Sequence, residues 1–136
     1  MDAEAARSFL QTHHRAVLAT VRSDGAPQLS PVTVTVDDAG RVLVSTRETA
    51  AKTRNVLRTP RASVCAFTDA FFGPFVQVEG PVEVVHLPEA MDGLIDYYRR
   101  AAGEHPDWDD YRAAMERDQR VLLRISIERA GPNVAG

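Results

Sequence analysis

The sequence predicts a mainly β fold, an antiparallel barrel of six strands with three or four helices at its periphery. The first observation is that apolar strand patterns recur along the chain and are mostly separated by short turns, which can join only antiparallel neighbours. The second is that so many short strands in 136 residues favour a barrel. A chain of this length forms one core, so we expect residues 1–136 to be a single domain.

Composition excludes several classes of protein. Hydrophobic residues make up 44% and charged residues 26% of the chain, which is ordinary for a soluble globular protein. No apolar run is long enough for a membrane span, and the segment from Met1 to Glu4 lacks the basic start of a signal peptide. The one cysteine, Cys65, cannot form an intrachain disulfide, so we expect a cytoplasmic protein. The net charge of −3 argues against a general nucleic-acid binder.

The N-terminal third predicts one helix and two strands. Residues 3–12 have the spacing of a short amphipathic helix, and residues 15–21 form an apolar strand pattern. Asp24-Gly25 is the signal of a tight hairpin turn. The next strand covers residues 28–36, where Pro31 marks an edge or a bulge because it cannot donate to a ladder.

The middle of the chain predicts a third strand that leads directly into a helix. Residues 41–46 are the strand, and the helix covers about residues 50–58. Thr49 is the expected N-cap, because a threonine hydroxyl accepts hydrogen bonds from the first free amides. Pro60 ends the helix, since the residue before a proline avoids helical backbone angles.

The second half of the chain predicts two strands, two helices and a last strand. The fourth and fifth strands cover residues 62–68 and 75–86, and Gly80-Pro81 suggests a bulge in the fifth. Apolar residues then recur at helical spacing twice before a final apolar run. These last elements cover residues 88–103, about 107–118, and 121–127.

The segment from Ser45 to Arg61 concentrates positive charge. It holds five cations and one acid, a net charge of +4 in a chain whose net charge is −3, and it contains Lys52, the only lysine. A helix N-terminus presents free N–H groups and a partial positive charge, so an anion, most simply a phosphate, is the natural ligand. The alternative is that Arg54, Arg58 and Arg61 form a solvated helix face.

Catalytic motifs are missing from the sequence. There is no nucleophile elbow, phosphate-binding P-loop or dinucleotide-binding glycine pattern. His13 and His14 are adjacent, and His86 and His105 are isolated, so we expect no metal site. No side chain can be assigned as catalytic. If the protein is an enzyme, a cofactor carries the reaction and the protein binds and orients it.

Three segments resemble the pyridoxamine-5'-phosphate-oxidase-like split barrels. They are the hairpin of Val17-Leu18-Ala19-Thr20-Val21 and Pro27-Gln28-Leu29-Ser30, the segment from Ala51 to Ser63, and Val78-Glu79-Gly80. More narrowly, the stretch from Ala102 to Arg112, with Trp108-Asp109-Asp110-Tyr111-Arg112 at its end, is similar to the branch that binds the deazaflavin coenzyme F420. The resemblance covers nearly the whole chain.

The resemblance implies a six-stranded split barrel of the FMN-binding type, which forms a homodimer with two cofactor sites at the subunit interface. It implies that the second strand binds the cofactor's ring and that the third strand and following helix bind its phosphate. It also implies that the fifth strand of the partner subunit approaches the cofactor. The implied ring residues are Gln28, Ser30, Pro31 and Val32; the phosphate residues are Ser45, Thr46, Lys52, Thr53, Arg54 and Asn55; and the residues from the partner are Phe75 and Gln77.

The function that the resemblance implies is an F420-dependent oxidoreductase that transfers a hydride between the coenzyme and an unsaturated small molecule. An FMN-binding oxidoreductase of the same fold is the first alternative. A carrier or sensor that binds F420 or flavin without turnover is the second, and a purely structural protein is the third. The sequence leaves the substrate open, and it predicts no nucleic-acid or membrane partner.

Overall fold

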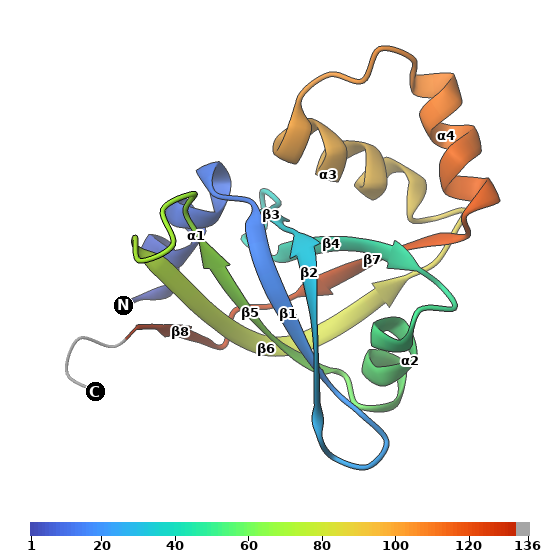
Figure 1. The fold of residues 1–136 in the computed structure, drawn as a ribbon. Helices are drawn as coiled ribbons and strands as arrows, with labels where there is room; N and C mark the ends of the chain where they lie inside the picture. The colour runs from blue at the N-terminus through green and yellow to red at the C-terminus, as the bar shows by residue number, and fades with distance from the viewer. Residues whose placement is uncertain (133–136) are drawn as a thin grey trace.

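The structure, a computed structural model, describes residues 1–132. An antiparallel sheet curls into a half-barrel, and helices pack at its ends and on its outer side (Figure 1). The described elements are α1 (Ala3–Thr12), β1 (Arg15–Val21), β2 (Pro27–Thr33), β3 (Thr35–Val36), β4 (Val42–Arg47), α2 (Ala51–Arg58), β5 (Arg61–Phe67), β6 (Phe75–Val85), α3 (Met91–Ala102), α4 (Trp108–Arg117), β7 (Arg120–Ile125) and β8 (Arg129–Gly131).

The sheet confirms antiparallel pairing throughout, but the expected number of six strands is wrong. Its order is β2-β1-β5-β6-β7-β4-β3, and β8 pairs with β6, which makes eight strands. The predicted second strand is divided at Val34, because β2 pairs with β1 whereas β3 turns to pair with β4. The other addition, β8, has only three residues and lies in a tail where the sequence carries no strand pattern.

The barrel is split along one line. In the described residues β2 pairs only with β1, and β3 covers β4 only at Val42 and Leu43. The rest of β4 approaches β2 without forming a ladder. We call the line between β2 and residues 44–47 of β4 the seam. Both strands present unpaired backbone N–H and C=O groups along it, which leaves those groups available to a ligand.

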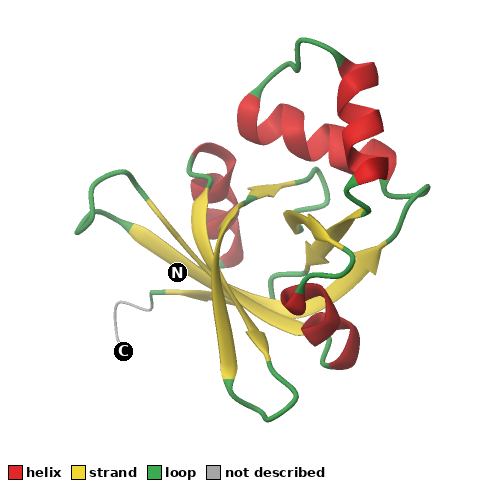
Figure 2. Ribbon diagram, turned by 45° about the vertical axis from the view of Figure 1, so that its right-hand side comes forward, coloured by secondary structure: helices red, strands yellow, loops and turns green. Residues whose placement is uncertain are grey.

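Two apolar clusters hold the fold together. The larger fills the half-barrel, where Leu18, Val64 and Leu123 are fully buried and α1 and α2 cover its ends. The smaller lies outside β4 and β7 under the α3–α4 pair, with Leu94 and Leu122 at its centre. Each such side chain stabilises the fold by about 1.5–3 kcal/mol through burial. Figure 2 shows α3 and α4 side by side, on a different part of the sheet from α2.

Two local predictions fail for identifiable reasons. Helix α2 begins at Ala51, so its cap is Ala50, which makes no side-chain hydrogen bond, and Thr49 lies one residue too early. Strand β6 continues through Gly80-Pro81 without the expected bulge. The glycine is needed there because a Cβ atom would lie 1.8 Å from the Ser126 carbonyl oxygen, where the chain after β7 crosses β6.

Other turn predictions are confirmed. Gly25 adopts a positive φ of 86° in the turn between β1 and β2, and β2 is an edge strand that includes Pro31. The same φ at Gly103 ends α3. No helix within residues 1–132 is both long and apolar enough to cross a membrane.

Candidate functional site

The β2 side of the seam carries the residues assigned to a ring. Gln28, Ser30 and Val32 pair with Thr20, Leu18 and Ala16 of β1, whose side chains are buried, so these three share the inner face of the sheet. Pro31 lies on the opposite face. The four residues therefore line one strand edge but not one surface, and Pro31 acts there through its backbone.

The β4 side leads into the N-terminus of α2. Because Ala50 supplies no side-chain cap, the backbone amides of Ala51, Lys52 and Thr53 have no intrahelical partner. Ser45 is half-buried on the outer face of β4, and Thr46 is buried on the inner face, opposite Val121. This helix end is therefore open, because no side chain of its own caps it in the way that the sequence predicts.

Three cations near this helix end make no side-chain hydrogen bond or ion pair with residues 1–132. They are Arg47 and Arg54, which are exposed, and Lys52, which is half-buried. The remaining cations of the segment are engaged elsewhere. Arg58 donates to the Asn55 side chain at 2.8 Å, and Arg61 pairs with Glu128 at 3.1 Å. Within this segment, the cations that have no side-chain partner in residues 1–132 therefore flank the first turn of α2 in the sequence.

Asn55 connects α2 to the other side of the seam. Its buried amide nitrogen donates to the Gln28 side-chain oxygen at 2.7 Å and to the Thr20 hydroxyl at 3.1 Å. Its oxygen accepts from Arg58. The buried hydroxyl of Thr53 likewise donates to the Arg47 carbonyl at 2.6 Å. These hydrogen bonds hold α2 to β1, β2 and β4 through the polar atoms of Asn55, Gln28 and Thr53. Asn55 thereby closes one end of the seam.

Tyr97 of α3 lies at the other end, and the sequence analysis missed it. Its hydroxyl donates to the Thr33 carbonyl at the end of β2, at 2.9 Å. Burial raises the pKa of this phenol, and the Ser45 backbone and the Arg120 guanidinium oppose that rise. The signal that could have revealed it is the polar tip of a tyrosine next to a core position, because a buried phenol hydroxyl needs a hydrogen-bond partner.

Phe75 and Gln77 lie apart from the other candidates within one chain. Their side chains are on the outer face of β6, three strand spacings from β2, or about 14 Å. With Glu79 and β8 they line a cavity of about 330 Å³. They can meet the seam only across an interface with another copy of the chain, which is the arrangement that the resemblance implies.

His14, His86 and His105 make separate contacts in different parts of the fold. His14 contacts the Val34 carbonyl at 2.8 Å, and His86 pairs with Glu48 at 3.3 Å beside a cavity of about 390 Å³. His105 packs against Tyr98 and Trp108, with ring centroids 5.1 and 5.7 Å apart. Within residues 1–132 no group of three metal-ligating side chains gathers.

Comparison with known proteins relates this architecture to others. The family described as pyridoxamine 5'-phosphate oxidase matches residues 2–132. Among solved structures, the conserved hypothetical protein Rv2991 from Mycobacterium tuberculosis is 26% identical with a TM-score of 0.78, covering 96% of this chain and 82% of that one.

Two further structures share the fold at lower identity. An F420 reductase is 22% identical with a TM-score of 0.70, covering 92% of this chain and 94% of that one. A heme-binding protein from Mycobacterium smegmatis is 21% identical with a TM-score of 0.72, covering 94% of this chain and 52% of that one. At these identities the likeness establishes the fold and leaves the ligand open.

Proposed function

The chain belongs to the pyridoxamine 5'-phosphate oxidase family, and we propose that it is an oxidoreductase that binds coenzyme F420 and reduces an unsaturated small molecule. The family binds flavins, and the structural neighbours include an F420 reductase as well as heme-binding proteins. The choice of F420 among these cofactors rests on the resemblance around Trp108 and on the charge of the site.

The observation that carries the proposal is the open N-terminus of α2 beside the seam. Three amides without an intrahelical partner begin this helix, and three cations without a side-chain partner in residues 1–132 lie within four residues of them in the sequence; Lys52 belongs to both groups. A phosphate fits this donor set, since a charge-assisted hydrogen bond contributes about 1.5–3 kcal/mol. The further positive charge of Arg47 and Arg54 suits the additional carboxylates of F420, which FMN lacks.

The chain's own part in the reaction is to bind and orient. When bound in its reduced form, F420 would supply a hydride from its deazaflavin ring and become oxidised. The unpaired edge of β2, with Ser30 and Val32 facing inward, offers backbone groups and a partly apolar wall to that ring. Lys52 and its neighbouring amides hold the anionic end. No side chain is assigned as a proton donor, so solvent protonates the product.

We further propose that the working unit is a homodimer. The outer face of β1, β5 and β6 carries the half-exposed Val17 and Cys65 in one cross-strand row, with the exposed Leu29 of β2 beside them. A second copy that covers this face brings its own Phe75 and Gln77 toward the seam.

Titration of the purified protein with F420 and with FMN tests the cofactor. We expect F420 to bind more tightly, because Arg47 and Arg54 can engage its extra carboxylates. Tighter binding of FMN would instead favour the flavin oxidoreductase of the same fold. Heme serves as a third ligand in the same experiment, because one structural neighbour binds it.

Turnover separates an enzyme from a carrier or sensor. Reduced F420 is mixed with the protein and a panel of electron-poor alkenes and related acceptors, and its oxidation is followed by absorbance. The proposal predicts acceptor-dependent oxidation. Tight F420 binding with no consumption across the panel would identify a carrier or sensor.

A further inference from the structure

The seam is closed at both ends by side-chain hydrogen bonds. At one end Asn55 reaches Gln28, and at the other Tyr97 reaches Thr33. Five residue steps separate Gln28 from Thr33 along β2, or about 17 Å. The free strand edges, and with them the two parts of the proposed cofactor site, lie between these two closures.

Tyr97 connects the β2 edge of the seam to the helix that packs against β4. Its hydroxyl donates to the Thr33 carbonyl on β2 at 2.9 Å, and α3 packs on β4, with Leu94 of the helix and Leu43 of the strand in one buried cluster. Ser45 belongs to the anionic end of the site, and Thr33 follows the ring-binding residues of β2. Within residues 1–132 the bond from Tyr97 to Thr33 is the only side-chain hydrogen bond that joins α3 to β2.

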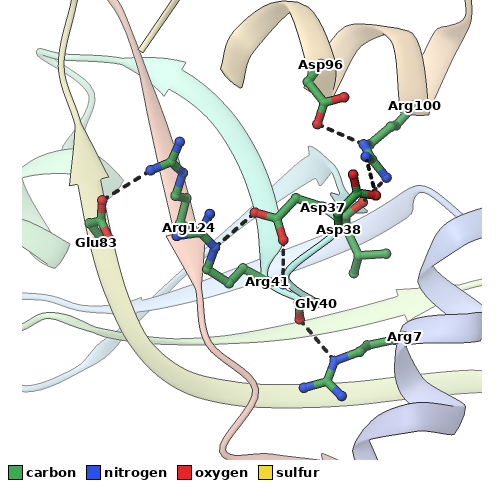
Figure 3. Close-up of polar contacts among 10 residues, drawn as sticks. Arg7, Asp37, Asp38, Gly40, Arg41, Glu83, Asp96, Arg100 and Arg124 are labelled. Carbon is green, nitrogen blue, oxygen red and sulfur yellow. Dashed lines mark hydrogen bonds and ion pairs between the residues drawn. The ribbon is translucent and has the colours of Figure 1, made fainter. Parts of the chain in front are cut away.

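Neighbouring contacts hold this hydroxyl in place. Three residues further along α3, Arg100 binds Asp96 of the same helix and Asp38 of the turn between β3 and β4, each at 2.8 Å (Figure 3). One turn earlier, the Leu94 carbonyl accepts a hydrogen bond from Tyr111 of α4 at 2.8 Å. Hydrogen bonds on both sides of Tyr97 therefore hold α3 in place, one to the turn between β3 and β4 and one to α4.

We propose that Tyr97 is a positioning residue for the cofactor, whose hydroxyl sets the separation of β2 and β4 so that one ligand engages the ring and anionic subsites together. The proposal rests on the proposed function. A ligand held at two points gains affinity only while the spacing of those points matches the ligand. Without the hydroxyl, the Thr33 carbonyl loses its donor and the end of β2 is no longer held to α3.

The variant Tyr97→Phe tests this, because it keeps the ring and removes only the hydroxyl. Tyr98→Phe is the matched control, since that neighbouring hydroxyl makes no hydrogen bond within residues 1–132 and its ring packs against Trp108 and Tyr111. The probes are F420 and its phosphate-free deazaflavin chromophore. We expect Tyr97→Phe to weaken F420 binding about tenfold and to leave the affinity for the chromophore unchanged. Tyr98→Phe should change neither affinity.

A double-mutant cycle with Lys52→Ala gives a second readout, which needs F420 alone. If Tyr97 couples the two subsites, removing Lys52 costs less F420 affinity in the Tyr97→Phe background than in the wild type. If Tyr97 were merely structural, Tyr97→Phe would lower the affinities for both probes equally and would lower the melting temperature in proportion. Its effect on F420 affinity would then be additive with that of Lys52→Ala.

The outcomes separate this inference from the proposed function. Additive effects, or F420 affinity unchanged in Tyr97→Phe, would overturn the positioning role while F420 binding by the wild type still stands. If the wild-type protein binds no F420, both proposals are overturned.

Discussion

Lys52 is the residue on which the proposed site depends most. It is the only lysine, it is half-buried at the open end of α2, and it makes no ion pair within residues 1–132. A compact ammonium beside free amides suits a phosphate oxygen, and the helix dipole adds to the attraction.

Lys52→Ala should therefore weaken F420 binding about ten- to a hundredfold, because a charge-assisted contact is lost. The measurement is an equilibrium titration by fluorescence. Arg61→Ala is the matched control, since Arg61 belongs to the same cationic segment but is exposed and paired with Glu128. Equal losses in both variants would mean that general charge, not a local contact, attracts the ligand.

At this scale the sequence identified the cations but not which of them are free. Arg58 and Arg61 look equivalent to Arg54 in the sequence, yet their partners Asn55 and Glu128 become visible only in three dimensions. Tyr97 was missed for the same reason: the Thr33 carbonyl that it meets is 64 residues away.

Among the elements, α2 is fixed by polar contacts as much as by burial. Asn55 is 6% exposed and its amide connects α2 with β1 and β2. Asn55→Ala leaves the buried groups of Gln28 and Thr20 without their donor. We expect a loss of about 2–4 kcal/mol in the free energy of unfolding, measured with urea.

Arg54→Ala on the same helix is the control for stability. Its side chain is exposed and has no partner within residues 1–132, so the free energy of unfolding should stay within about 0.5 kcal/mol of the wild type. Similar losses in the two variants would contradict the role given to Asn55.

The α3–α4 pair gives the fold a predictable response to alkali. Burial raises the pKa of Tyr111 to about 12. Since its folded pKa exceeds the ordinary value of about 10, the phenol's contribution is complete below pH 10 and is lost as pH rises toward the folded pKa. Tyr111→Phe should be less stable at neutral pH, having lost its bond to Leu94, and should lose less stability between pH 10 and 12.

Unfolding free energies of both proteins at pH 8, 10 and 11.5 check this. Parallel pH curves for the wild type and Tyr111→Phe would show that another group governs the alkaline loss.

The elements themselves were largely predictable, because hydrophobic periodicity and turn residues are local signals. The four helices and the hairpin turn at Gly25 follow from them. The division of the second strand at Val34 does not, since it depends on β3 leaving β1 and finding β4. Neither does β8, a three-residue strand created by the edge of β6.

For the whole molecule, the proposed contact of Phe75 and Gln77 with the cofactor requires the proposed homodimer, because within one chain they lie about 14 Å across the sheet from β2. Leu29 is 65% exposed on the face that we expect the partner to cover. Leu29→Glu should therefore dissociate the dimer without unfolding the chain, and should weaken F420 binding at the same time.

Sedimentation equilibrium measures the first effect and titration the second. Ala113→Glu, at an exposed position of α4 outside that face, is the control for charge. A Leu29→Glu protein that is monomeric yet binds F420 with unchanged affinity would show that the site is complete within one chain.

At this scale the overall class could be predicted, since many short hairpin-linked strands leave few alternatives to a curled antiparallel sheet. The position of the seam could not, because it depends on which pair of strands fails to form a ladder. That is decided by the pairing of β3 with β4 and by the side chains of Asn55 and Tyr97, which hold the seam's ends.

The most direct test of the whole account is an amide NMR titration of the protein with F420. We predict that the backbone resonances of Ala51, Lys52 and Thr53 shift and saturate together with the deazaflavin absorbance change, because these amides bind the anionic end. Saturable F420 binding that leaves those three amides unchanged and shifts resonances elsewhere would contradict it.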